Sequence, residues 1–328
     1  MQIGLSLSLT AQLRLSTSAY VVSGFEPALV FDFKNSYYRK GEESTVFASA
    51  ITHARASSAT MINSSGTLVT VGNNVPRTGH HIYNGSAWVN EGILHESEPR
   101  TNQMLYSDDL TRTAWTGQAN AGTVTAGSPF GTYQTISPSA NGGNLGPAQK
   151  YQIGKSITSG STYVGWALVK YSAGSGWFVV NMYDTGKANE QAYFDLQNGV
   201  VGSKEALIID HGMVDYGDGW WLCWASSNAA SGSGGVSYEM PNGDGVQSCS
   251  AADVILIAGS QFEQGSTPSS YIPTSGSTVT RAAETLTIPA ANMPYDSTNM
   301  SIQMDGRMTF TDTDAYALVQ LHWWQLDT

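Results

Sequence analysis

Charge is scarce in this 328-residue chain: only 12% of residues are charged, and the acidic excess gives a formal net charge of -11. The 15 lysines and arginines are scattered, and Arg39 and Lys40 are the one adjacent pair, so the sequence shows no basic patch to attract nucleic-acid phosphates. No apolar run approaches the roughly 18 residues that span a bilayer. Binding to nucleic acid and insertion into a membrane are therefore excluded as expected functions.

Cysteine is nearly absent as well, with Cys223 and Cys249 alone in the chain. Two cysteines are too few for a disulfide framework at this length, so we interpret both as reduced thiols in strands, with one bridge as the alternative. Motifs of catalysis are missing too, since there is no G-x-S-x-G elbow, no Walker glycine loop and no H-E-x-x-H sequence. We expect a protein that is not an enzyme.

Carboxylates suited to glycosidase chemistry are present, but no spacing places two of them across a scissile bond. They are Asp184, Glu190, Asp195, Asp210, Asp215, Asp218, Asp253 and Glu263. We interpret them as solvated groups and expect no cofactor. A structural calcium ion is the one exception left open, for which Asp195, Asp253 or Glu263 would supply hard oxygen ligands. No other set of metal ligands can be assigned.

Adjacent histidines occur at His80 and His81. In a regular strand neighbouring side chains point to opposite faces, which prevents a pair of this kind from chelating one metal ion. We interpret both as surface histidines in turns.

Glycine, serine and threonine are abundant, and no segment shows sustained helical periodicity. This composition predicts an all-β fold with short strands, and the length predicts two or three domains. β-prone runs separated by turn residues predict a sandwich of jelly-roll type. The runs are 163–170, 177–183, 192–196, 220–224, 236–240 and 254–258.

The last of these runs leads into a polar segment. Gln261, Glu263 and the Pro/Ser/Thr cluster that follows are expected to end the strand ladder, because prolines cannot donate to it. The apolar pair Tyr271 and Ile272 lies between two prolines and is expected to pin this exit loop back onto the sandwich.

The N-terminus is apolar at every odd position over more than a dozen residues. A period of two predicts one long amphipathic strand, and the absence of Lys or Arg before Arg14 disfavours a signal peptide. We predict a virion-anchoring strand that docks on a neighbouring subunit by β-augmentation, with a first strand of the next domain as the alternative. The anchoring residues are Ile3, Leu5, Leu7, Leu9, Ala11, Leu13 and Leu15.

Several short phrases occur in a fixed order: RASSAT at 55–60, NVPR at 74–77, EPRTN at 98–102, YSD at 106–108, Trp115, and the segments 260–274 and 279–283. In this order the chain resembles bacteriophage tail fibre and spike-type structural proteins with a jelly-roll domain similar to carbohydrate-binding modules. The resemblance covers about 28–288. It departs at Ser260 and Phe262, where such proteins more often have alanine and leucine.

The resemblance and the patterns together predict four parts: an N-terminal β anchor (1–24), a small hairpin module (25–105), the jelly-roll sandwich (106–288) and the start of a further β domain (289–328). After Arg281, strands are expected at 286–288, 300–304, 308–310 and 318–324. The last part is too short to close a domain alone. We expect it to donate a strand to a neighbour or to continue in a longer polypeptide.

Aromatic side chains are the remaining functional signal, because sugar rings stack on them. Trp177, Asn181 and Tyr183 alternate on one face of a predicted strand, and Trp166 lies in another, so these four form the candidate sugar-binding set. Trp220, Leu222 and Trp224 share a face that we interpret as core.

The resemblance implies a tail fibre that binds host-surface polysaccharide. It would assemble as a homotrimer with other tail or baseplate proteins in the host cytoplasm and reside in the virion. A depolymerase with a catalytic part beyond residue 328, and a head-fibre or decoration protein, are the alternatives.

Overall fold

The computed structural model describes residues 27–139, 148–184, 190–294 and Gly306. The predicted anchoring residues Ile3, Leu5, Leu7, Leu9, Ala11, Leu13 and Leu15, and the predicted strands at 300–304, 308–310 and 318–324, lie outside the described residues. Within them the fold is all-β as predicted, with strands β1 to β23 and very little helix.

The described residues divide into two compact units, 27–52 with 286–294 and 53–285 with Gly306. The boundaries fall within β4 (Thr52–Ala54) and β23 (Thr285–Thr287). The expected boundary at residue 105 lies inside the second unit, because the hairpins before it pack on the sandwich that follows.

The first unit is a small three-stranded sheet, β1 (Leu29–Asp32), β2 (Tyr37–Lys40) and β3 (Glu43–Thr45), with the one-turn helix α1 (Phe47–Ala50) and the 3-10 turn η2 (Ala290–Asn292). Tyr38 packs edge-on against the rings of Phe33 and Phe47, at centroid distances of 5.9 and 5.8 Å. Asn292 donates to the carbonyl of Ser49 at 2.8 Å, which fastens η2 to the helix.

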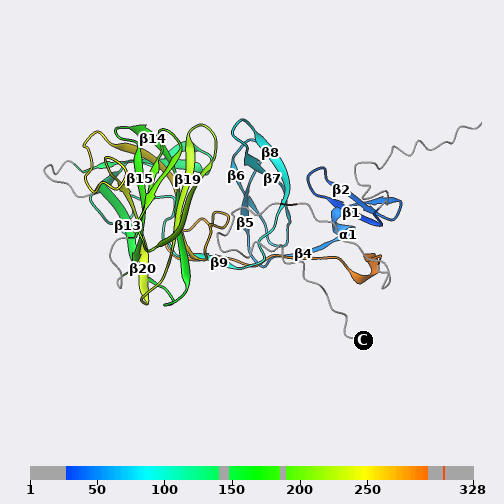
Figure 1. The fold of residues 1–328 in the computed structure, drawn as a ribbon. Helices are drawn as coiled ribbons and strands as arrows, with labels where there is room; N and C mark the ends of the chain where they lie inside the picture. The colour runs from blue at the N-terminus through cyan, green and yellow to red at the C-terminus, as the bar shows by residue number, and fades with distance from the viewer. Residues whose placement is uncertain (1–26, 140–147, 185–189, 295–305, 307–328) are drawn as a thin grey trace, which may run out of the picture. The chain divides into compact units, whose positions relative to one another are not determined.

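The second unit contains a sandwich of two antiparallel sheets, shown mainly in green and yellow in Figure 1. The seven-stranded sheet has the order β10 (Ala119–Ala121), β12 (Gly131–Pro138), β21 (Val254–Gln264), β14 (Thr162–Ala173), β19 (Trp220–Asn228) and β18 (Ile208–Asp215), with β11 (Thr125–Ser128) also pairing β12. The five-stranded sheet has the order β13 (Ala148–Ser156), β20 (Ser233–Met240), β15 (Trp177–Asp184), β16 (Gln191–Asp195) and β17 (Val200–Lys204).

Successive strands cross repeatedly between the two sheets, and each sheet turns one apolar face inward. The core between them includes Phe178, Phe194 and Tyr238, with the rings of Phe178 and Tyr238 stacked at 5.9 Å. Cys223 is buried in this core on β19, and Cys249 packs against it from the segment between β20 and β21. The two do not form a disulfide, as predicted, but only Cys223 lies in a strand.

Two hairpins form a cover for the outer face of the seven-stranded sheet. They are β5 (Ala59–Ile62) with β6 (Leu68–Val71), and β7 (Arg77–Tyr83) with β8 (Trp88–Leu94). A second apolar cluster lies on this outer face and includes Trp166, Trp220, Leu222 and Trp224, with Leu68 packed against it. The predicted Trp220 face is thus buried, but it lies under this hairpin cover, whereas Cys223 faces the core between the sheets.

The exit loop is pinned as predicted. Tyr271 and Ile272 are 5% and 4% exposed, and the Tyr271 ring stacks on Phe130 at 4.8 Å. The predicted end of the ladder is wrong, because β21 continues through Gln261 and Glu263. Their polar side chains are tolerated in a buried strand because the exit loop supplies hydrogen bonds: the Ile272 N–H donates to Gln261 Oε1, and the Ser269 N–H to Glu263 Oε1.

A buried network of three arginines and two glutamates connects the hairpin cover to the chain leaving the sandwich. Arg77 donates to both Glu96 and Glu284 at 2.7 Å, Arg55 also donates to Glu284, and Arg281 lies 3.1 Å from Glu96. The three guanidinium side chains are at most 2% exposed, so these ion pairs are shielded from water and salt. We call these five residues the buried joint.

Burial alone would raise the pKa of Glu284. The hydrogen bonds and charge of Arg77, the Glu96 N–H at 2.8 Å and the Arg55 guanidinium outweigh burial and lower this pKa to about 2. The carboxylate therefore stays ionised across the whole ordinary pH range.

Beside the joint, β9 (Arg100–Asn102) pairs with β22 (Val279–Arg281), so the chain enters and leaves the sandwich through neighbouring strands. Asn102 is fully buried, and its amide donates to the carbonyls of Ser260 and Ile272 at 3.0 and 2.9 Å. The N–H groups of Phe262 and Met104 donate to its side-chain oxygen. One side chain thus holds the strand entering the sandwich, its last strand and its exit loop together.

Candidate functional site

Three of the four predicted sugar-binding residues share one surface. Trp177, Asn181 and Tyr183 alternate along β15 on the face turned away from the core. Tyr183 is 41% exposed, and Trp177 and Asn181 are half-buried. We call this surface, with its neighbours on β16 and β20, the β15 face.

A buried carboxyl group lies at the centre of the β15 face. Glu239 on β20 is 2% exposed and accepts hydrogen bonds from Asn181 Nδ2 and Gln191 Nε2, both at 2.8 Å. Burial raises its pKa, although these two amides and Ser237 favour the ionised form. Because both amides donate to Glu239, their own oxygens can accept from other donors, and the Gln191 oxygen does so within the protein.

The polar network continues across β16. Tyr193 donates from its hydroxyl to Gln191 Oε1 at 2.7 Å, and Gln247 donates to the same oxygen. Burial, together with the charges of Glu205 and Glu239, raises the pKa of Tyr193 to about 12, so its hydroxyl stays protonated. These contacts hold Asn181 in one orientation beside the exposed Tyr183.

The Trp177 ring reaches across β16 and packs against β17 of the same sheet. A Cβ at Gly202 would lie 2.7 Å from the Trp177 ring, so the ring packs directly against the Gly202 backbone. Asp244 closes the same edge by accepting from the N–H of Ser203 at 2.9 Å. One side of the indole is therefore packed, which fixes its plane.

Trp166 does not join the other three residues. It is 0% exposed on β14 of the opposite sheet, where its indole N–H lies 3.5 Å from Glu263 and its ring contacts Phe130 and Tyr271. The sequence does indicate that Trp166 is buried, because β14 is apolar at both odd and even positions, a pattern typical of a strand buried on both faces.

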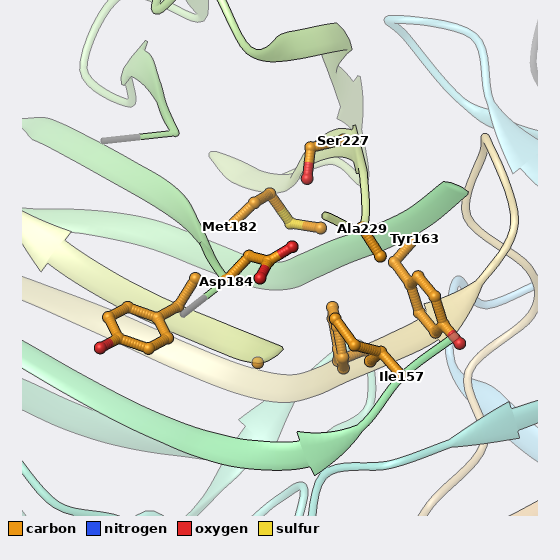
Figure 2. Close-up of a pocket in the computed structure, with 9 residues that line it drawn as sticks. Ile157, Tyr163, Met182, Asp184, Ser227 and Ala229 are labelled. Carbon is orange, nitrogen blue, oxygen red and sulfur yellow. The ribbon is translucent and has the colours of Figure 1, made fainter. Parts of the chain in front are cut away.

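A small cavity lies beside the end of β15 (Figure 2). Its volume of about 10 Å³ is enough for one water molecule and not for a sugar ring. It is lined by Ile157, Tyr163, Met182, Tyr183, Asp184, Ser227, Ala229, Gly235 and Phe262. Asp184 itself accepts from Ser231, so this carboxylate has a structural role in the turn after β19.

The predicted calcium ligands are used as turn and loop acceptors. Asp195 accepts from the N–H groups of Gln197 and Asn198, Asp253 from those of Ser175 and Ser250, and Glu263 from Ser269. In the part of the chain that the structure describes, no three His, Cys, Asp or Glu side chains gather as a metal site.

The histidine prediction is wrong in its geometry. His80 and His81 lie within β7, where the register shifts between them, and both line one pocket under the hairpin cover. A β-bulge of this kind breaks the alternation of faces that the prediction assumed.

No described helix has the length and apolar character needed to cross a membrane. No family model and no curated protein matches the chain. Eighteen chains of solved structures match, among them the CBM22-1–GH10 modules of endo-1,4-β-D-xylanase 10B from Clostridium thermocellum, complexed with xylohexaose. That likeness has a TM-score of 0.27 and 10% identity, and it covers 54% of this chain and 30% of that chain. It supports no conclusion about what this chain binds.

Proposed function

We propose that this protein is a non-enzymatic phage virion component, a tail fibre that binds host-surface glycans through the β15 face. The observation that carries the proposal is the arrangement of Trp177 and Tyr183 on either side of Asn181, over the buried Glu239. The order of short phrases that resembles phage fibre and spike proteins supports the virion role.

The chemistry of the β15 face suits a sugar chain. Aromatic rings offer flat apolar surfaces for the C–H faces of pyranose rings, and amide groups bond hydroxyls from fixed positions. Tyr183 and Trp177 supply the rings, and Asn181, locked by Glu239, supplies the amide. A surface prepared in this way loses little conformational entropy when a glycan binds.

Replacing Tyr183 tests the stacking. We expect Tyr183→Ala to lower glycan affinity about tenfold, because an aromatic contact contributes about 1 kcal/mol beyond its buried area. Tyr183→Phe keeps the ring and should stay within about threefold of the parent protein. The measurement is a glycan array with the full chain, followed by titration of the best ligand. Silence of the parent protein on host polysaccharides, or equal affinity of both variants, would contradict glycan binding at this face.

The anchoring role of the N-terminus is tested separately. Deleting residues 1–16 should abolish incorporation of the protein into particles while leaving glycan binding by the purified protein unchanged. Incorporation is measured by immunoblotting of purified virions complemented with either form. A truncated protein that still enters particles would contradict the anchor and leave the β15 face unaffected.

A further inference from the structure

A pocket lies between the hairpin cover and the outer face of the seven-stranded sheet, wholly within the second unit. Its volume is about 100 Å³. One wall comes from β7 and β8 with His81, Tyr83 and Trp88, and the other from β18, β19 and the turn after β18, with Val214 and Tyr216. Many of these side chains are half-buried, so the pocket is open to solvent.

The walls of this pocket are aromatic. Trp88 packs against Tyr83 and Tyr216 at centroid distances of 5.4 and 6.0 Å, and Tyr216 in turn packs against Phe130 at 5.8 Å. The backbone of a glycine packs directly against each of two rings. A Cβ at Gly66 would lie 2.2 Å from the Trp88 indole, and one at Gly217 would lie 3.2 Å from the Tyr83 ring. The ring planes are therefore fixed in the absence of any ligand.

Polar groups in the same lining lack partners within the protein. Among the residues that the structure describes, neither the Tyr216 hydroxyl nor the Trp88 indole N–H has a hydrogen-bond partner. Burial raises the pKa of Tyr216 to about 12, so the hydroxyl keeps its proton and can donate. An aromatic hydroxyl that is half-buried without a partner costs stability unless water or a ligand bonds it.

Acceptors complete the lining. His81 Nδ1 lies 2.8 Å from the carbonyl of Gly79, which can only accept, so this contact fits the tautomer with its proton on Nδ1, in which Nε2 is an acceptor. Asp215 adds a carboxylate, of which Oδ1 accepts from the Gly217 N–H. The pocket thus combines fixed aromatic faces with hydrogen-bond donors and acceptors. A site for a purely apolar ligand would need only the aromatic faces.

We propose that this pocket binds a single pyranose ring, with hydroxyls bonded by Tyr216, Asp215 and His81 and the apolar face stacked on Trp88. The pocket is smaller than the cavity of about 150 Å³ that accepts benzene in another protein, so the sugar ring would enter it in part and keep its remaining hydroxyls in solvent. The site lies on the opposite sheet from the β15 face and does not depend on glycan binding there.

The test uses the full chain and three methyl glycosides as probes, those of D-glucose, D-galactose and N-acetyl-D-glucosamine, with cyclohexanol as the apolar competitor. Binding is followed by ligand-observed saturation-transfer NMR and by titration, in the parent protein and in Tyr183→Ala. We expect at least one glycoside to bind in both, more tightly than cyclohexanol. No glycoside binding in Tyr183→Ala, or tighter binding of cyclohexanol, would overturn the proposal.

Two variants locate the binding. Tyr216→Phe removes one hydroxyl and should weaken the glycoside about fivefold without lowering the melting temperature, because that hydroxyl has no protein partner. Tyr133→Phe is the matched control on the same sheet, outside the pocket, and should change nothing. Val214→Trp places an indole in the pocket from a half-buried strand position and should abolish binding. Unchanged glycoside affinity in Val214→Trp, checked for folding by its melting curve, would overturn the proposal.

Discussion

Replacing Glu284 by glutamine lowers the free energy of unfolding by about 3–5 kcal/mol, because it leaves buried arginines without their shared carboxylate. Glu284 accepts from Arg55 and from two nitrogens of Arg77, and all three side chains are fully buried. A glutamine would turn an amide N–H toward at least one guanidinium, which can only donate. After the change, Glu96 alone would face three buried positive charges. Urea unfolding of the purified chain measures the loss.

Glu263→Gln is the matched control. Glu263 is equally buried, but burial raises its pKa, and its hydrogen bonds come from neutral donors, Ser269 and Trp166. A glutamine keeps one acceptor for them, so the expected loss is below about 1 kcal/mol. Similar losses in the two variants would mean that the arginines of the buried joint do not require the Glu284 charge.

The stabilisation that Glu284 contributes should depend on pH, and the pKa of Glu284 gives the direction of that dependence. The pKa of Glu284 falls from an ordinary value of 4.5 to about 2 in the folded chain. The unfolded state therefore takes up its proton first as the pH falls. The stabilisation from Glu284 is complete above pH 4.5 and is lost progressively as the pH falls through about 2. The difference between parent and Glu284→Gln, about 3 kcal/mol from the shift, should shrink over this window. A difference that is constant from pH 7 to pH 2 would contradict the mechanism.

Asn102→Ala is the second change with a large expected effect, a loss of about 3–4 kcal/mol. The alanine would remove two donated and two accepted hydrogen bonds and leave the buried carbonyls of Ser260 and Ile272 and the N–H of Phe262 without this partner. The backbone of β21 and of the exit loop should open to solvent more often, which is measured as faster backbone hydrogen exchange in these two segments. Thr101→Ala, on the same strand, removes only a surface pair with Thr280 and should cost less than about 1 kcal/mol. Equal costs for the two variants would contradict the role of Asn102.

The strands of the sandwich could be predicted from the sequence because each depends on local residues. The runs at 163–170, 177–183 and 220–224 all lie within observed strands, since β-branched and aromatic residues between glycine turns favour a pleated, buried conformation. The alternation that placed Trp177 and Tyr183 on one face also holds.

Long-range charge pairing could not be predicted. Arg55 and Glu284 are 229 residues apart, and both look like ordinary solvated charges in the sequence. Gln261 and Glu263 look like the end of a strand in the sequence for the same reason, since their hydrogen-bond partners in the exit loop are visible only in the fold. The pocket at Tyr216 was missed because its two walls come from segments that no local pattern relates.

The phrases that resemble phage fibre proteins have a structural role in this fold. RASSAT contains Arg55, NVPR contains Arg77, EPRTN contains Asn102, and the segment 279–283 contains Arg281. All four residues are buried at the joint or beside it, and none of them lies on the β15 face. The resemblance therefore follows the way the sandwich is attached, and the proposal of glycan binding at the β15 face rests on other residues.

The pairing of Arg55 with Glu284 determines how tension would travel along the chain. A pull applied at residue 55 and at residue 284 acts on two ends that are already joined by an ion pair and, close by, by the β9–β22 ladder. The 176 residues from 103 to 278 form a loop outside that path, since they begin after Asn102 and end before Val279. Tension between residues 55 and 284 would therefore load the joint and bypass the sandwich, so the sandwich would keep its shape under force.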